Sequence, residues 1–204
     1  RRGLTILGDN QIGYLGEGTR KSEWYRLINL SESNVTISQK TIDGSGADIF
    51  ELNEQNWLEN SEVPAQQSCH FSIDAYGNAV GTHYANIRMT VDQPQHYEIL
   101  QPIQARVLAT LDQRLDTDWQ WFGSDQGVDQ QSEHSYEQNG EQIREQKQWL
   151  LTYLNGDGVL NIDFDTNEIS DLQVYVNEKP FSAPADSIPV SSGHNEILIS
   201  YSDT

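Results

Sequence analysis

The sequence has 204 residues and carries 12 Lys and Arg against 31 Asp and Glu, a formal net charge of −19 at pH 7. This acidity argues against nucleic-acid binding, because phosphate contacts require clustered Lys and Arg. It argues equally against attraction to an anionic membrane surface. No apolar run is long enough to span a bilayer, so we expect no membrane insertion. Hydrophobic residues make up 36%, and 5 Trp, 9 Tyr and 5 Phe provide enough large side chains for packed cores.

Short runs in which apolar and polar residues alternate recur along the chain, separated by Gly, Asn, Asp and Pro. In chain order these runs are residues 23–29, 69–73, 84–91, 104–109, 158–164, 172–176 and 196–201. Runs of this length and spacing are typical of antiparallel β-sandwiches. Residues 140–151 have a helical composition, but their apolar residues form a poor amphipathic stripe. The sequence therefore predicts an all-β chain.

The charge is shared unequally between the two halves of the chain. Residues 1–110 hold 8 basic and 13 acidic residues, a net charge of −5, whereas residues 111–204 hold 4 and 18, a net charge of −14. Such asymmetry indicates two units with different surfaces. The run at 104–109 is expected to close the first unit, and a polar stretch at 112–118 follows it. We therefore predict two tandem antiparallel β-sandwiches, 1–110 and 111–204.

Glycine-containing segments predict turns in the second half. Residues 155–158, Asn-Gly-Asp-Gly between two apolar runs, form the strongest hairpin signal, because glycine accepts a positive φ. Residues 177–180 and 192–195 predict further turns.

The sequence carries no catalytic or nucleotide-binding motif. Its 5 His are scattered without the H-E-x-x-H spacing, and it has no G-x-S-x-G segment, no Walker loop and no dinucleotide fingerprint. Cys69 is the single cysteine, and His70 follows it directly. Because adjacent residues on a strand point to opposite faces, the two cannot share a proton. We expect Cys69 to be a buried structural thiol and the chain to have no enzymatic activity.

Calcium is the one candidate cofactor. Oxygen-bearing side chains stand at positions 1, 3, 5 and 9 of one segment: Asp163, Asp165, Asn167 and Asp171. The segment lacks the Gly at position 6 and the Glu at position 12 of an EF-hand loop. The alternative is that these residues form the solvent face of a strand. Residues 124–129 are a second oxygen-rich stretch.

Carbohydrate binding is suggested by two tryptophans near the start of the second half. Trp119 and Trp121 alternate, so on a strand they share one face. If that face points outward, the two rings form a platform on which a sugar can stack. The alternative is that one or both belong to the core.

The first half resembles the bacterial immunoglobulin-like modules of the ASPM/SPD-2/Hydin type. Five segments carry the resemblance in order: a glycine-containing segment at 16–19, a strand with an Asn-x-Ser turn at 25–38, a Gly and Phe segment at 46–52, a Pro and Cys strand at 63–73, and a Gly-x-x-x-Ala strand at 81–87. The family often pairs its cysteine with another after the Phe strand. Trp57 occupies that region here, so the resemblance leaves Cys69 unpaired.

The second half resembles the jelly-roll-like C-terminal modules of large exported bacterial proteins, including secreted subtilisin-like proteases. The matching segments are a Trp and Gly segment at 118–124, a Gly-x-Gly turn with its flanking strands at 149–160, a polar corner and strand at 166–177, and a final Pro-to-Tyr-Ser segment at 188–202.

Together the two resemblances imply a fragment of a larger exported bacterial protein that is secreted, displayed at the cell surface or periplasmic. The implied role is non-catalytic: spacing, adhesion or ligand binding. The expected partners are a carbohydrate or a surface protein, together with the rest of the parent polypeptide. The alternative is an accessory C-terminal region of a secreted hydrolase that aids substrate binding or secretion.

Overall fold

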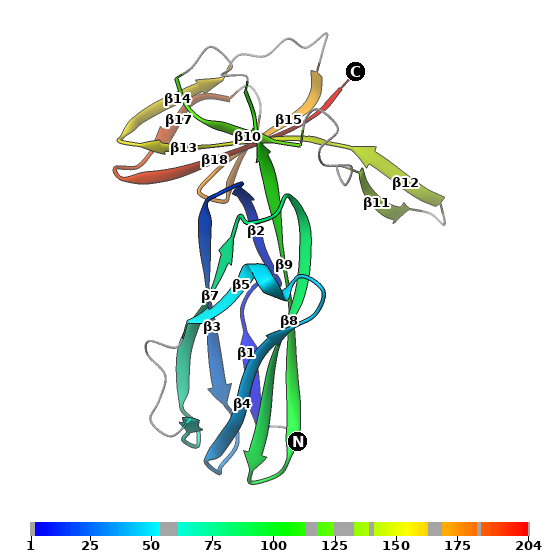
Figure 1. The fold of residues 1–204 in the computed structure, drawn as a ribbon. Coiled ribbons are helices and arrows are strands. Elements are labelled where there is room, and N and C mark those ends of the chain that lie inside the picture. The colour runs from blue at the N-terminus through cyan, green and yellow to red at the C-terminus, as the bar shows by residue number, and fades with distance from the viewer. Residues whose placement is uncertain are drawn as a thin grey trace. The chain divides into compact units, whose positions relative to one another are not determined.

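The computed structural model describes residues 3–53, 61–112, 118–124, 133–138, 141–162, 169–182 and 185–203. The chain divides into two compact units, residues 1–107 and 108–204 (Figure 1). Both are built from antiparallel strands, which confirms the predicted all-β fold. Within these ranges no helix has the length and apolar character that a membrane crossing requires.

The first unit is a sandwich of two sheets. Its elements are β1 (Leu4–Leu7), β2 (Gln11–Gly16), β3 (Arg20–Asn29), β4 (Val35–Asp43), the 3-10 turn η1 (Ala47–Ile49), β5 (Phe50–Asn53), β6 (Glu62–Val63), β7 (Ser68–Tyr76), β8 (Gly81–Gln93) and β9 (Tyr97–Thr110). One sheet has the order β1-β3-β7-β5, and the other runs β9-β8-β4-β6, with β2 also paired to β9. The order of the first sheet is that of strands A, B, E and D in constant-type immunoglobulin domains, and β4, β8 and β9 take the places of C, F and G.

Alternation along each strand sends one set of side chains into a common core. On β3, Tyr25 and Leu27 are buried while Trp24 and Arg26 are exposed. Residues from both sheets meet in one apolar cluster, which joins Leu27 and Phe71 of one sheet to Ile37, Ile87 and Ile103 of the other. The rings of Tyr25 and Phe71, cross-strand partners, stack with centroids 5.5 Å apart.

The boundary between the units falls inside a strand. The sequence predicted it after residue 110, and the compact units divide after Val107. The cause is that β9 continues to Thr110, and its last residues, Ala109 and Thr110, pair with β10 of the second unit.

The second unit has a five-stranded sheet and two two-stranded sheets. Its strands are β10 (Trp121–Gly123), β11 (Glu133–Gln138), β12 (Glu141–Gln146), β13 (Gln148–Asn155), β14 (Gly158–Ile162), β15 (Ile169–Val176), β16 (Lys179–Ser182), β17 (Ala185–Val190) and β18 (His194–Asp203). The main order is β16-β15-β18-β13-β10, while β14 pairs with β17 and β11 with β12. Residues 141–146 and 148–151 are strand, so the helical composition of 140–151 was misleading.

The predicted hairpin at residues 155–158 is wrong. The chain does turn there, with φ of +117° at Gly156 and +152° at Gly158. However, β13 is already paired on one side with β10 and on the other with β18, so no edge is left for β14. The turn instead carries the chain from the main sheet to the β14–β17 sheet. The turn at 177–180 is a true two-residue hairpin, because Val176 pairs with Lys179.

The same geometry recurs where β17 leads into β18. These strands belong to different sheets, so residues 191–193 carry the chain back to the main sheet. The two connections are joined by Gly156 N, which donates to Gly193 O at 3.1 Å. We call these two connections, 155–158 and 191–193, the paired arches. Trp121, Leu160 and Ile197 belong to the apolar core of this unit.

Candidate functional site

The two predicted sugar-stacking tryptophans occupy different environments. Trp121 is 5% exposed and belongs to the core of the second unit, whereas Trp119 is 38% exposed. Their ring centroids lie 6.3 Å apart with 42° between the planes. Trp121 therefore supports the neighbouring ring from the core side, and Trp119 is the member of the pair that presents an exposed aromatic surface.

The segment that follows Trp119 is anchored by two hydrogen bonds. Thr152 Oγ1 donates to Gln120 O at 2.8 Å, and Leu111 N donates to Trp121 O at 2.9 Å. These bonds hold the backbone after Trp119 to β13 and to Leu111, which directly follows β9. A ring on an anchored backbone loses less conformational freedom on binding than one on a free loop.

Trp119 lines a hollow of about 420 Å³ in the second unit. The other lining residues come from the end of β13, the first arch and the strands β14 and β17: Tyr153, Leu154, Asn155, Gly156, Asp157, Gly158, Val159, Leu160 and Val190. A volume of about 300–1,000 Å³ with aromatic and apolar walls and a few polar groups is usual for small-ligand sites. Val159, 62% exposed, adds apolar surface to the hollow.

The polar groups of this hollow lie on the first of the paired arches. Asn155 and Asp157 are exposed there. The arch is held in place by Asn195, whose Nδ2 donates to Gly156 O at 3.2 Å and to Ser191 O at 2.8 Å. An amide and a carboxylate on a fixed turn beside an exposed indole offer both donors and acceptors to a hydroxyl-rich ligand.

The sequence pointed to Trp119 but not to the residues around it. Asn155 and Asp157 lay in a segment expected to be a hairpin tip, and no sequence pattern pointed to Tyr153 as a binding residue. Their placement depends on β14 leaving the main sheet, which alternation along the chain does not encode.

The predicted calcium residues are mostly outside the described part of the chain. Asp163, Asp165 and Asn167 fall in residues 163–168, which the structure does not describe. Asp171 is exposed and has a φ of +53°, at the irregularity in pairing between Ser170 and Gln173. Within the ranges described above, no three His, Cys, Asp or Glu side chains gather as metal ligands would. Calcium binding stays a prediction of the sequence.

Cys69 is buried in β7, at 5% exposure, while His70 points outward and is exposed. The opposite orientation of the two side chains follows from the alternation of the strand. Burial raises the pKa of the Cys69 thiol, with Lys40 opposing the effect. A thiol in this setting holds less thiolate at neutral pH than a free cysteine, so it is a poor nucleophile.

We expect the Cys69 thiol to resist modification in the folded protein. At pH 8, its reaction with 5,5′-dithiobis(2-nitrobenzoic acid) should be slower by about a hundredfold or more than in guanidinium chloride, because access requires local opening of the strand. The absorbance of the released thionitrobenzoate measures both rates. Rapid labelling of the native protein would contradict the buried placement.

Comparison with solved structures finds similarities at low sequence identity and low TM-score. The chain is similar to the secreted serine protease VesC from Vibrio cholerae at 11% identity and a TM-score of 0.42, with 98% of this chain and 46% of that chain covered. It is similar to the Vibrio cholerae VesB protease at 12% identity and a TM-score of 0.41, with 51% and 32% covered. A protein of unknown function from Porphyromonas gingivalis W83 gives 8% identity and a TM-score of 0.43, with 98% and 83% covered.

This chain spans less than half the length of either Vibrio protease. No protein-family model and no curated protein matches the sequence. Likenesses at these identities and TM-scores carry nothing about function.

Proposed function

We propose that the chain is a non-catalytic pair of binding modules from a larger exported bacterial protein, and that its second unit binds carbohydrate at the hollow beside Trp119. The first module would be of the ASPM/SPD-2/Hydin immunoglobulin-like type and the second jelly-roll-like. The observation that carries the proposal is the exposed indole of Trp119, braced by the buried Trp121 and lining a hollow with polar groups on a fixed arch.

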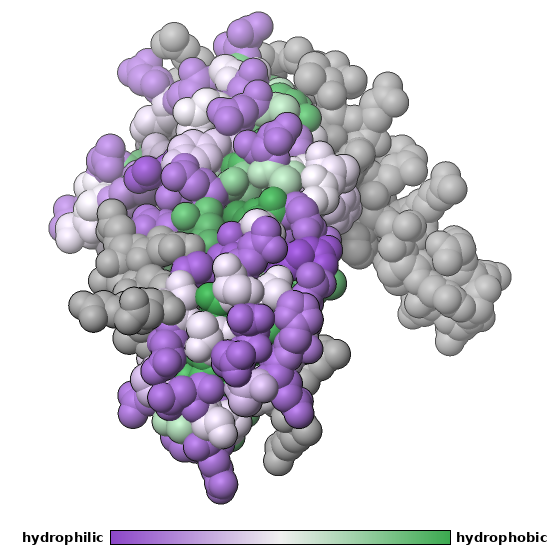
Figure 2. Space-filling model, turned by 60° about the horizontal axis from the view of Figure 1, so that its bottom comes forward, coloured by the Kyte–Doolittle hydropathy of each residue, from purple (hydrophilic) through white to green (hydrophobic). Residues whose placement is uncertain are grey.

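The chemistry of this hollow suits a sugar. The electron-rich face of an indole attracts the polarised C–H groups on one face of a pyranose ring. A sugar hydroxyl both donates and accepts hydrogen bonds. The amide of Asn155 can do both, and the carboxylate of Asp157 accepts. The face drawn in Figure 2 is mainly hydrophilic, with limited apolar areas between the polar ones.

Support for a non-catalytic role comes from the residues that catalysis would use. The one cysteine is buried with a raised pKa. His83 Nε2 lies 2.7 Å from the carbonyl oxygen of Ala79, a structural contact. His96 is paired with Asp92 at 3.6 Å on an exposed turn, four residues apart, with both side chains open to solvent.

A glycan array tests the binding proposal. We expect the wild-type chain to bind a subset of glycans, and Trp119→Ala to reduce that signal by about tenfold or more, equivalent to about 1.4 kcal/mol of lost stacking. The matched control is Trp24→Ala, because Trp24 is 58% exposed on β3 and does not line the hollow beside Trp119. Repeating the array with calcium and with EDTA tests the predicted calcium site.

Two results would contradict the proposal. One is an array in which Trp119→Ala binds as the wild type does. The other is sustained hydrolysis of a bound glycan that disappears on substitution of a single carboxylate or histidine.

A further inference from the structure

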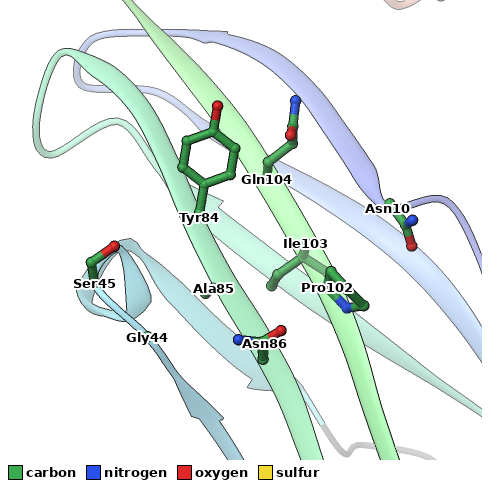
Figure 3. A pocket seen from close by; sticks show the side chains of 9 residues that line it. All are labelled: Asn10, Gly44, Ser45, Tyr84, Ala85, Asn86, Pro102, Ile103 and Gln104. Atoms are coloured by element: carbon green, nitrogen blue, oxygen red, sulfur yellow. The ribbon is translucent and has the colours of Figure 1, made fainter.

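A second hollow lies on the outer side of the first unit, in the sheet formed by β4, β8 and β9. It has a volume of about 310 Å³. Nine residues line it: Asn10, Gly44, Ser45, Tyr84, Ala85, Asn86, Pro102, Ile103 and Gln104 (Figure 3). Its position is independent of the hollow beside Trp119, because every lining residue belongs to the first unit.

The centre of this hollow is an exposed aromatic ring on a rigid strand. Tyr84 is 57% exposed. Its cross-strand partner on β9 is Gln104, and the next pair on the same face is Asn86 with Pro102. Figure 3 shows the side chains of Tyr84 and Gln104 standing next to each other on the neighbouring strands. A phenol ring, two amides and a proline ring therefore form one continuous surface.

The rim of the hollow is fixed to the sheet by backbone contacts. Gly46 N donates to Tyr84 O at 2.8 Å, and a Cβ built at Gly46 would lie only 2.7 Å from Tyr84 N. On the opposite rim, Gln104 N donates to Asn10 O at 2.8 Å. The wall on each side is thus already in place before any ligand arrives, which lowers the entropic cost of binding.

The lining is polar but carries no charged side chain, in a chain with a net charge of −19. Nearby charged groups on this face are engaged in ion pairs with one another. Arg88 lies 2.5 Å from Asp43 and 2.7 Å from Glu98, Nε to Oδ2 and Nη1 to Oε2 respectively. The lining itself therefore offers no charged side chain for an anionic or cationic ligand to pair with.

The amides of this hollow are available for a ligand. Among the residues that the structure describes, the side chains of Asn86 and Gln104 have no hydrogen-bond partner within the protein. Each amide provides two donors and one acceptor oxygen, which matches the mixed donor and acceptor character of neighbouring hydroxyls on a sugar ring. Tyr84 adds a stacking face and a phenolic hydroxyl.

We propose that this hollow is a second, separate carbohydrate site, specific for a neutral glycan. Tyr84 stacks on one face of a pyranose ring, and the side chains of Asn86 and Gln104 hydrogen-bond its hydroxyls. This inference stands on the first unit alone and does not depend on the hollow beside Trp119.

The experiment uses the full chain carrying Trp119→Ala, so that the hollow of the second unit no longer contributes stacking. Its binding is compared with that of the double variant Trp119→Ala, Tyr84→Ala on an array of neutral, sialylated and sulfated glycans. We expect neutral glycans to bind the single variant, and the double variant to lose about tenfold or more of that signal. Tyr84→Phe, which keeps the ring, should stay within about threefold of the parent.

Leu100→Ala is the matched control, because Leu100 is 52% exposed on β9 and does not line the hollow. Circular dichroism melts of each variant check that it remains folded. Absence of neutral-glycan binding in Trp119→Ala, binding unchanged by Tyr84→Ala, or binding of anionic glycans alone would each overturn the inference. If Trp119→Ala by itself abolishes all binding, the proposal for the first unit fails while that for the second stands. If Trp119→Ala retains full binding and the double variant Trp119→Ala, Tyr84→Ala loses it, the proposal for the second unit fails while that for the first stands.

Discussion

Phe71→Ala is expected to lower the free energy of unfolding of the protein by about 4 kcal/mol. Phe71 is 1% exposed at the centre of the first unit, and its ring stacks on Tyr25 at 5.5 Å with 15° between the planes. Truncation removes the transfer free energy of a buried aromatic side chain and leaves a cavity between two sheets that cannot close. Tyr25 OH is hydrogen-bonded to Asp9 O at 2.7 Å, which restrains the neighbouring ring from moving into the space.

Equilibrium unfolding in urea measures the effect, with secondary structure followed by circular dichroism. Phe71→Leu retains most of the volume and should cost less than about 1.5 kcal/mol, so the series stays informative if the alanine variant does not fold. His70→Ala, at the exposed neighbouring position, should change stability by no more than about 0.5 kcal/mol. A loss below about 1 kcal/mol for Phe71→Ala would mean that this ring is not in the core.

Asn195→Ala is expected to destabilise the second unit by about 3 kcal/mol, an unusually large effect for a polar residue. Asn195 is completely buried, and its amide joins the paired arches. Nδ2, with its two N–H donors, lies 2.8–3.2 Å from the carbonyl oxygens of Gly156, Ser191 and Gly193. Oδ1 accepts from Ser191 N at 3.2 Å and from Asn177 Nδ2 at 3.0 Å. Alanine would remove these hydrogen bonds and leave a cavity at a fully buried position of β18.

The decisive comparison is with Asn195→Asp. A carboxylate keeps the acceptor oxygen but loses both donors, and it would face the carbonyl oxygens of the arches. We therefore expect Asn195→Asp to be at least as destabilising as the alanine variant. Ser192→Ala, an exposed change in the second arch, should be neutral within about 0.5 kcal/mol in the same urea titration. A tolerated Asn195→Asp would show that the amide donors do not hold the arches.

The strands were predictable wherever one face of a strand is buried and the other is solvated. The runs at 23–29, 84–91 and 196–201 lie within β3, β8 and β18 because the alternation of their side chains matches the pleat. Short strands such as β10 gave no such signal. Their position depends on pairing with β9 and β13 rather than on their own composition.

The connections were less predictable, for a physical reason. The segment at 155–158 has the residues of a hairpin, and glycines with positive φ do form a turn there. Whether a turn joins neighbours in one sheet depends on which strand edges are free, a property of distant sequence. Here β10 and β18 occupy both edges of β13, so the same local turn becomes an arch.

The candidate sites, too, were predictable only in part. Spacing predicted that Trp119 and Trp121 share one strand face, but β10 begins at Trp121 and Trp119 precedes it. Spacing also could not say which of the two the core would take. Tyr84 looked like any alternating strand residue. It becomes a candidate ligand contact because β8 pairs with β9 in a register that places Tyr84 beside Gln104. In addition, Gly46 N donates to Tyr84 O, which holds the turn at Gly46 against β8.

The most direct test of the central claim is the indole region of the ¹H–¹⁵N spectrum, titrated with the glycan that binds most strongly on the array. The chain has 5 Trp, and the variants Trp119→Phe and Trp24→Phe assign the indole resonances of these two exposed residues. We predict that the Trp119 indole resonance moves in a saturable way while that of Trp24 does not, and that the glycan is recovered uncleaved. An unmoved Trp119 resonance at saturation, or a cleaved glycan, would contradict a non-catalytic carbohydrate site in the second unit.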